Sequence, residues 1–446
     1  MKTLIAGSGL SGKSAFDYLE KIGTEVEFVP NEILNYFDKE KDFEKADRLF
    51  DGLSFLVKSP GITFDNELIK YALKKKVKII SELELGLAAS KGDKIGVTGT
   101  NGKTTTVTLI NFLLKDSGRN IFLGGTIGTP VTRFCDKTKD GDITIVEASS
   151  FQLERNRNSH FHIAAILNIT PDHLNHHRSM KDYIKSKQNI TKKQTENDYL
   201  LLNADSEILM QNVPKTKAKI FYFSTEKQVE GCYIKRGSIY FNDNLSEKKL
   251  VSLKGVRLVG KHNLQNILCA CLAVYLELKR VDLLKDISNF GGVPHRIEYV
   301  KTINGISFFN DSKATNIDST KVAISSFSCG INLILGGSDK GYEFDEIFAK
   351  IPKNVRNIAI FGQTKQKIAI SAKKFGYKNV VICSCLKDCV CKLYQLAKPG
   401  EIVLLSPACA SFDCFSNFEE RGVVFKKIVE EISIYENAQV CCEQKT

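Results

Sequence analysis

The stretch of sequence that decides the fold is Gly99-Thr100-Asn101-Gly102-Lys103-Thr104, which follows the apolar run at residues 94–98. The apolar run predicts a buried strand, and residues 105–114 predict a helix. Glycines let backbone N–H groups curl around phosphate oxygens, Lys103 supplies a positive charge, and Thr104 offers a hydroxyl to Mg²⁺. The pattern departs from GxxxxGK[ST], because the first required glycine falls at Val97. The strand and helix on either side nevertheless indicate a phosphate-binding loop.

Length and composition bound the class of protein. A chain of 446 residues predicts about three domains of ~150 residues each. We see no secretory segment and no apolar run near the ~18 residues of a membrane span, so we expect a cytoplasmic protein without a membrane span. Thirteen irregularly spaced cysteines fit reduced thiols better than a disulfide framework.

The net charge of +12 raises the question of nucleic acid. The lysines are scattered, and no basic patch interleaved with aromatic residues is present, so we expect no nucleic-acid partner. A basic balance also suits an anionic substrate, and charge alone therefore does not decide the function.

The tightest cysteine cluster is Cys383, Cys385, Cys389 and Cys391. Its spacing is not that of a usual zinc site. Residues 380–385 predict a buried strand, and residues 386–396 predict a helix in which cysteine acts as a small apolar residue. We therefore favour a packing role over a metal site.

Residues 1–89 predict a small doubly wound unit, with strands at 2–6, 25–29, 54–58 and 77–80 and a helix at 13–21. The turn after the first strand carries Gly7, Gly9 and Gly12. A nicotinamide site would need an acidic residue at the end of the second strand, where the sequence reads Val29-Pro30-Asn31. NAD is therefore disfavoured, whereas a nucleotide diphosphate on the helix N-terminus stays an alternative.

The rest of the chain predicts two further α/β blocks, at residues 90–293 and 294–446. The middle block has apolar strands at 143–146 and 162–167, and the last block has strands at 332–335, 358–361, 380–385 and 402–405 between helical stretches. The expected fold class is α/β with three domains. These are a Rossmann-like nucleotide-binding domain, a central P-loop ATPase-type domain and a C-terminal Rossmann-like domain.

Polar side chains close several of these strands. Glu147 ends one apolar strand, where nucleotide-hydrolysing sites set a carboxylate against magnesium. His173, His176 and His177 follow the next strand and would be spaced for zinc in a helix, but Pro171 favours a loop. A single histidine contacting magnesium or substrate is the preferred interpretation. Residues 183–187 predict the start of a helix whose lysines would ordinarily face solvent.

Asn263 and Asn266 lie three residues apart on one predicted helix face, which suits hydrogen bonds to a purine edge, although such a pair is often only a helix cap. Residues 294–296, 310–316 and 404–411 place further polar side chains in loops or after strands. Open α/β sheets bind ligands at that edge.

These segments together resemble the Mur ligase family, which builds the peptide stem of peptidoglycan. The matching motifs occur in the family's order across nearly the whole chain: GTNGKTT (99–105), EASSFQLE (147–154), NITPDH (168–173), YIKSK (183–187), GKHNLQN (260–266), PHRIE (294–298), NDSKATN (310–316), LGGSDKG (335–341) and SPACASFDCFSNFEERG (406–422). The second and last are similar to the D-glutamate-adding member. The resemblance implies an ATP-dependent amide ligase that joins D-glutamate to UDP-N-acetylmuramoyl-L-alanine through an acyl phosphate.

The resemblance also implies which residues form each site. Catalysis would use Lys103, His173 and Lys187. ATP would be bound by Gly99, Thr100, Asn101, Gly102, Lys103, Thr104, Thr105, Asn263, Asn266, Arg296 and Asp311. Two magnesium sites would use Thr104, Glu147, His173 and Lys187, the last as a carbamate. The uridine substrate would contact Gly7, Gly9, Leu10, Ser11, Gly61 and Thr126. D-Glutamate would be held by Thr315, Lys340, Ser411 and Phe418.

Two departures from the family pattern concern the uridine substrate. Thr126 stands in Gly124-Gly125-Thr126-Ile127-Gly128, where the family usually has an asparagine. The set expected to bind uridine reads Pro30-Asn31-Glu32 instead of an Asp-Thr-Arg-like sequence. The ATP site is therefore better determined by the sequence than the uridine site.

Two other functions stay open on the sequence. A folylpolyglutamate or diaminopimelate-adding ligase of the same family would share the phosphate loop but lack the 406–422 segment. A non-enzymatic nucleotide-binding regulator would bind nucleotide without substrate-dependent phosphate release. Phosphate release with each candidate amino acid separates them.

Overall fold

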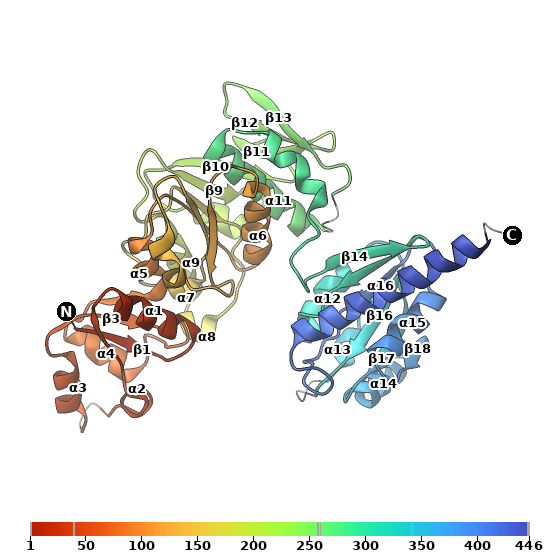
Figure 1. Ribbon diagram of the computed structural model, residues 1–446, viewed down its shortest axis with the longest axis horizontal. Helices are drawn as coiled ribbons and strands as arrows, with labels where there is room; N and C mark the ends of the chain where they lie inside the picture. Colours follow the sequence, from red (N-terminus) through yellow and green to blue (C-terminus); the bar gives the residue numbers. More distant parts are fainter. Residues whose placement is uncertain are drawn as a thin grey trace. The chain divides into compact units, whose positions relative to one another are not determined.

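The computed structural model describes residues 2–38, 41–256, 258, 260–339, 341 and 343–443. The chain divides into two compact units, the first formed by residues 1–254 and 261–287 and the second by residues 255–260 and 288–446. Each unit is built from β-strands covered by α-helices (Figure 1). The predicted α/β class is confirmed, whereas the three domain boundaries stay a prediction.

The N-terminal sheet of the first unit has four parallel strands in the order β2-β1-β3-β4. The strands are β1 (Lys2–Ala6), β2 (Glu25–Phe28), β3 (Leu53–Lys58) and β4 (Ile79–Ser81). The helices are α1 (Leu10–Lys21), α2 (Asn31–Tyr36), α3 (Phe43–Phe50), α4 (Glu67–Lys74) and α5 (Glu82–Ala89). A Cβ on Gly12 would lie 1.9 Å from the carbonyl oxygen of Gly7, so the third glycine is needed for α1 to pack against the turn.

The second sheet of this unit has nine strands in the order β13-β12-β11-β10-β9-β8-β5-β7-β6. The strands are β5 (Asp93–Thr98), β6 (Ile121–Gly125), β7 (Ile143–Glu147), β8 (Ile163–Ile166), β9 (Tyr199–Asn203), β10 (Lys219–Ser224), β11 (Gly231–Lys235), β12 (Ser238–Asn242) and β13 (Glu247–Ser252). Strands β5 to β11 pair in parallel, whereas β11 to β13 form antiparallel hairpins that the sequence pattern did not predict. The first hairpin turns at Arg236 and Gly237, both at positive φ, as a two-residue loop requires.

Helices cover both faces of this sheet. They are α6 (Lys103–Leu114), α7 (Ser150–Leu153), α8 (Leu174–His177), α9 (Met180–Gln188), α10 (Glu207–Gln211) and α11 (Lys261–Leu278), with short 3₁₀ turns η1 (Val131–Arg133), η2 (Cys135–Lys137), η3 (Asn189–Thr191) and η4 (Asp282–Asn289). Helices α6 and α11 pack side by side on one face, and α5, α7 and α9 lie on the other (Figure 1). Strand β5 lies between β7 and β8, so the loop that follows β5 sits where the strand order reverses.

The second unit has one six-stranded sheet in the order β14-β15-β19-β16-β17-β18. Its strands are β14 (Glu298–Ile303), β15 (Ile306–Asn310), β16 (Ile331–Gly336), β17 (Val355–Phe361), β18 (Val380–Ile382) and β19 (Ile402–Leu405). Its helices are α12 (Ile317–Ser325), α13 (Asp345–Phe348), α14 (Lys365–Lys374), α15 (Leu386–Leu396) and α16 (Phe418–Glu443). Of these six strands, β14 alone runs antiparallel to its neighbour.

The predicted buried strand at 380–385 is wrong in its length and burial. Strand β18 ends at Ile382, whose side chain is 48% exposed, because β18 is the edge of the sheet and only one neighbour covers it. Cys385 is exposed and directly precedes α15, whereas Cys389 is buried on α15. Among the described residues, no helix has both the length and the apolar character that a membrane crossing requires.

A buried arginine joins the loops of the second unit. Arg421 on α16 is fully buried, and burial lowers the pKa of its guanidinium to about 10. The guanidinium donates to the carbonyl oxygens of Ser312 (2.8 Å), Cys409 (3.1 Å) and Ala410 (3.2 Å), and to the Ser312 hydroxyl at 2.9 Å. The Ser312 hydroxyl in turn donates to the Phe418 carbonyl at 2.8 Å. Arg421 therefore fixes the 311–315, 408–411 and 418 segments to one another.

We predict that Arg421→Met lowers the free energy of unfolding by about 3 kcal/mol or more, because several buried carbonyls lose a charged donor. Denaturation followed by circular dichroism measures the change. Arg356→Met is the matched control, since Arg356 is 58% exposed and its guanidinium contacts the Glu401 carboxylate at 3.9 Å. The control should change stability by less than about 1 kcal/mol. Equal shifts in the two variants would contradict the role of Arg421.

Candidate active site

The loop between β5 and α6 has the backbone that phosphate binding needs. Gly99 has φ 155° and Gly102 has φ 85°, both in the region that favours glycine. A Cβ on Gly102 would lie 2.3 Å from Oδ1 of Asn266, so a larger residue there would force the buried Asn266 side chain to move. Helix α6 begins at Lys103, and its free N–H groups open onto this loop. The predicted strand, loop and helix are confirmed.

A second loop, which follows β8, braces the phosphate loop. The Asn101 N–H donates to the Asn168 side chain at 2.9 Å, and the Asn168 amide donates back to the Asn101 carbonyl at 3.0 Å. The Thr100 hydroxyl accepts from Thr170 N–H at 3.0 Å and lies 3.1 Å from the Tyr183 hydroxyl. The predicted site residues did not include Asn168, Thr170 or Tyr183. All three lie in the segments 168–173 and 183–187, and the match of these segments to the family motifs could have indicated that they belong to the site.

A hydroxyl and a carboxylate meet beside the start of α6. Thr104 donates to Oε2 of Glu147 at 2.9 Å, and Glu147 is only 4% exposed at the end of β7. Oxygen ligands of this kind suit Mg²⁺. Thr126 lies next to this pair, since its N–H donates to the Glu147 carbonyl at 2.8 Å and its hydroxyl donates to Gln152 at 2.7 Å.

Two lysines converge on the phosphate loop. Lys187 on α9 donates to the Gly99 carbonyl at 2.8 Å, and Lys103 donates to the same oxygen at 2.9 Å and to the Thr100 carbonyl at 2.8 Å. Lys187 is only 1% exposed, so the expectation of a solvent-facing lysine is wrong for this residue. Burial, with the charge of Lys103 as a second cause, lowers the pKa of Lys187 to about 7.

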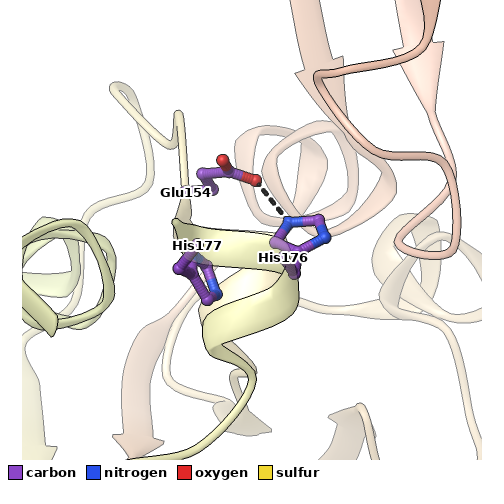
Figure 2. Close-up of side chains that lie close together, drawn as sticks. All are labelled: Glu154, His176 and His177. Carbon is purple, nitrogen blue, oxygen red and sulfur yellow. Dashed lines mark hydrogen bonds and ion pairs between the residues drawn. The ribbon is translucent and has the colours of Figure 1, made fainter. Parts of the chain in front are cut away.

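The three histidines do not act as one cluster. His173 has φ 52° and a half-exposed side chain, and it packs against the Phe151 ring with centroids 4.9 Å apart. His176 lies on the short helix α8 and contacts Oε2 of Glu154 at 3.0 Å. His177 is buried and contacts the Ser150 hydroxyl at 2.9 Å. His176 and His177 therefore group with Glu154 instead of His173 (Figure 2).

The first turn of α11 reaches the phosphate loop. Asn263 and Asn266 are both buried, and the Asn266 amide donates to the Asn263 side chain at 3.3 Å. Asn266 also lies against Gly102. The helix places both asparagines on one face beside the loop, and their contact with adenine stays a prediction.

The predicted uridine residues of the first sheet lie around the start of α1. Gly7 has φ 100° and its carbonyl accepts from the Ser59 hydroxyl at 3.1 Å. Helix α1 begins at Leu10, directly after Gly9, and Leu10 is 57% exposed. Ser11 lies in the first turn of this helix. Gly61 follows β3 in open space, since a Cβ there would meet no atom within 4 Å.

In the second unit, Asp311 holds a turn that carries Arg296. Asp311 is buried, accepts from Ser406 at 2.7 Å and from the Ile297 N–H at 3.2 Å, and burial raises its pKa to about 7. Thr315 is half-buried in the same loop, which Arg421 ties to the loop after β19.

The other residues predicted to bind D-glutamate lie on two further segments. Ser411 is 2% exposed, and Phe418 begins α16 with a half-buried ring. The ammonium of Lys313 lies 5.7 Å from the centre of that ring. The predicted residue Lys340 lies outside the described residues.

Comparisons with known proteins identify relatives of this chain. Residues 97–274 match the family model described as Mur ligase middle domain, and residues 295–409 match the one described as Mur ligase, glutamate ligase domain. A UDP-N-acetylmuramoylalanine--D-glutamate ligase of Thermoanaerobacter pseudethanolicus is 38% identical over 97% of this chain and 98% of its own length. A ligase of the same name from Bacillus mycoides is 38% identical over 96% of this chain and 97% of its length.

Solved structures agree on the fold. UDP-N-acetylmuramate-alanine ligase MurC from Thermotoga maritima has a TM-score of 0.55 and 19% identity, covering 97% of this chain and 99% of that chain. MurF ligase from the same organism, solved with ADP, has a TM-score of 0.53 and 18% identity, covering 89% and 93%. Because relatives that match almost the whole chain share more than a third of its residues, and residues 97–274 and 295–409 match the family's domains, the chain belongs to the Mur ligase family.

Proposed function

We propose that this protein is an ATP-dependent amide ligase that joins D-glutamate to UDP-N-acetylmuramoyl-L-alanine, with release of ADP and phosphate, in cytoplasmic synthesis of the peptidoglycan precursor. The observation that carries the proposal is the phosphate loop on which Lys103, Lys187 and the Thr104–Glu147 pair meet. The names of relatives that match almost the whole chain support the same substrates.

The phosphate loop accounts for the use of ATP. The left-handed glycines and the N-terminus of the twelve-residue helix α6 offer backbone N–H groups to phosphate oxygens. The Lys103 ammonium lies over the loop backbone, where it would neutralise the charge that builds up as the alanyl carboxylate approaches the γ-phosphate. We assign the adenine to the amides of Asn263 and Asn266, and further contacts of the nucleotide to Arg296 and Asp311 of the second unit.

The residues near Thr104 fit magnesium. Thr104 and Glu147 would hold one ion, and His173 with a carbamate on Lys187 would hold a second. A neutral amine is the form that reacts with carbon dioxide, and a lysine with a pKa of about 7 is largely neutral at slightly alkaline pH. Magnesium would supply charge neutralisation between the two anionic reactants.

Charge explains why the reaction needs activation. A carboxylate is a poor electrophile, so its oxygen first attacks the γ-phosphate to give an acyl phosphate and ADP. The amine of D-glutamate then attacks the acyl carbon, and phosphate leaves as the amide forms. We assign D-glutamate to Thr315, Lys340, Ser411 and Phe418, and the uridine substrate to the loop at Gly7, Gly9, Leu10 and Ser11 with Gly61 and Thr126.

We predict that Lys103→Ala lowers turnover by about 10²-fold or more, because the phosphates lose a positioned charge. Release of phosphate with both substrates present measures the effect. Lys115→Ala is the matched control, since Lys115 caps the other end of α6 and is half-exposed. Near-normal turnover by a folded Lys103→Ala protein would contradict the ATP site.

We predict that Lys187→Ala is nearly inactive and that short-chain carboxylates restore part of its activity, because they replace the negative charge of the carbamate. Lys185→Ala, on the same helix, is the control and should neither lose activity to that extent nor respond to carboxylates. No rescue at any carboxylate concentration, together with an unmodified Lys187 in a high-resolution structure, would overturn the carbamate.

We predict that Ser411→Ala raises the Michaelis constant for D-glutamate about tenfold and leaves that for ATP unchanged, since losing a donor to a buried carboxylate costs about 1–3 kcal/mol. Lys340→Ala should act in the same direction. Ser416→Ala, at an exposed position of the same loop, is the control. Unchanged D-glutamate saturation, or a preference for L-alanine or diaminopimelate, would assign the protein to another member of the family.

A further inference from the structure

Glu154, His176 and His177 form a cluster that the proposed ligase mechanism does not use. One ligand atom from each residue lies within 4.8 Å of the other two. Figure 2 shows the Glu154 carboxylate directed toward the His176 ring, with His177 on the same helical turn. Tetrahedral zinc spaces its ligand atoms about 3.3 Å apart, so the three atoms need to close by no more than about 1.5 Å.

Neighbouring side chains hold the cluster in place. The Asn189 amide donates to the Glu154 carbonyl at 2.9 Å and to the Leu153 carbonyl at 2.8 Å, which fixes the backbone that carries Glu154. Both ring nitrogens of His177 contact a hydroxyl, Nε2 that of Ser150 at 2.9 Å and Nδ1 that of Ser186 at 3.4 Å. Metal-binding histidines usually have their second nitrogen held by such a partner, which fixes the ring orientation.

The cluster is largely buried, but it opens onto a cavity. The side chains of His176 and Glu154 are 10% and 21% exposed, and both line a cavity of about 580 Å³. The cavity gives an ion a path to the cluster and leaves room for a water molecule as a fourth ligand.

The surroundings select the class of ion. Two imidazoles and one carboxylate match the ligands of zinc and related transition metals, whereas Mg²⁺ prefers oxygen ligands. Besides Glu154, the charged side chains that line the same cavity are the cations of Lys70, Arg155, Arg157, Arg178, Lys185 and Lys192 and the carboxylates of Asp65 and Asp182. This excess of positive charge disfavours an ion that is held by charge alone, but not one that bonds to imidazole nitrogen. We propose that Glu154, His176 and His177 form a transition-metal site of the zinc type, separate from the proposed magnesium ligands.

Binding there would affect the proposed reaction through one aromatic ring. Phe151 packs against His173, His176 and His177, with centroid distances of 4.9, 4.4 and 5.5 Å. Drawing His176 and His177 onto an ion displaces the surface against which Phe151 and His173 rest. Zinc therefore lowers ligase turnover. This consequence rests on the proposed function, whereas the binding of zinc does not rest on it.

The first test titrates the full-length protein with zinc chloride against a chromophoric chelator, in the presence of millimolar Mg²⁺. The chelator should remove zinc from His176→Asn and Glu154→Gln at chelator concentrations at least about tenfold lower than those needed for the wild-type protein. His160→Asn is the matched control, because His160 also contacts a carboxylate, that of Asp198 at 2.8 Å, yet lies outside the cluster. Circular dichroism confirms that each variant is folded.

The second test replaces zinc with Co²⁺ and records the visible spectrum, because the thirteen cysteines offer competing ligands. A tetrahedral site of nitrogen and oxygen gives strong visible bands without the near-ultraviolet thiolate band. We expect those bands in the wild type and in His160→Asn, and their loss in His176→Asn. A thiolate band, unchanged zinc affinity in His176→Asn, or loss of zinc in His173→Asn alone would overturn the proposal. If zinc binds but does not lower turnover, that result would instead count against the link between the zinc site and the ligase reaction.

Discussion

Two lysines share one backbone carbonyl at the centre of the first unit. The Nζ atoms of Lys103 and Lys187 both donate to the Gly99 oxygen, at 2.9 and 2.8 Å. Two ammonium groups within about 6 Å of each other repel by about 3 kcal/mol at an effective dielectric constant near 20. Lowering the pKa of Lys187 to about 7 relieves that repulsion. A carbamate on Lys187 would turn the repulsion into attraction, so the proposed modification and the phosphate-binding charge of Lys103 are mutually supporting.

The loop that carries this carbonyl is held from three directions. Asn168 pairs with Asn101 through two hydrogen bonds, and the Thr100 hydroxyl joins the loop after β8 to α9 through Tyr183. Asn266 packs so closely on Gly102 that a Cβ there would force the Asn266 side chain to move. Because β8 is a neighbour of β5 in the sheet, the loop after β8 that carries Asn168 lies beside the phosphate loop, whereas Tyr183 and Asn266 come from helices α9 and α11. The loop is thus formed in the right shape before any ligand arrives, which reduces the entropy that binding must supply.

Local patterns in the sequence were sufficient for the phosphate loop, Glu147 and the strands that precede them, because the strand-loop-helix unit is determined by neighbouring residues, but they did not predict β6, β9 or β10 to β15. They were insufficient for the burial of Lys187, which depends on α9 packing over a loop 88 residues earlier in the chain. The pairing of His176 with Glu154 and the position of Arg421 depend on tertiary packing in the same way. Residues 380–385 looked like a buried strand because their composition does not reveal that the strand lies at a sheet edge.

The second unit holds the turn around Arg296 at a cost in backbone energy. His295 and Ile297 have φ of 64° and 45°, and a β-branched residue at positive φ is rare, costing about 1–3 kcal/mol. Glu298 accepts from the His295 N–H at 2.9 Å, and Asp311 accepts from the Ile297 N–H at 3.2 Å, so two carboxyl groups offset the strain. Between these two residues stands Arg296. The two carboxyl groups fix the backbone of the turn from which the exposed Arg296 side chain extends, which would favour the proposed contact of its guanidinium with the nucleotide by lowering the entropy that this contact costs.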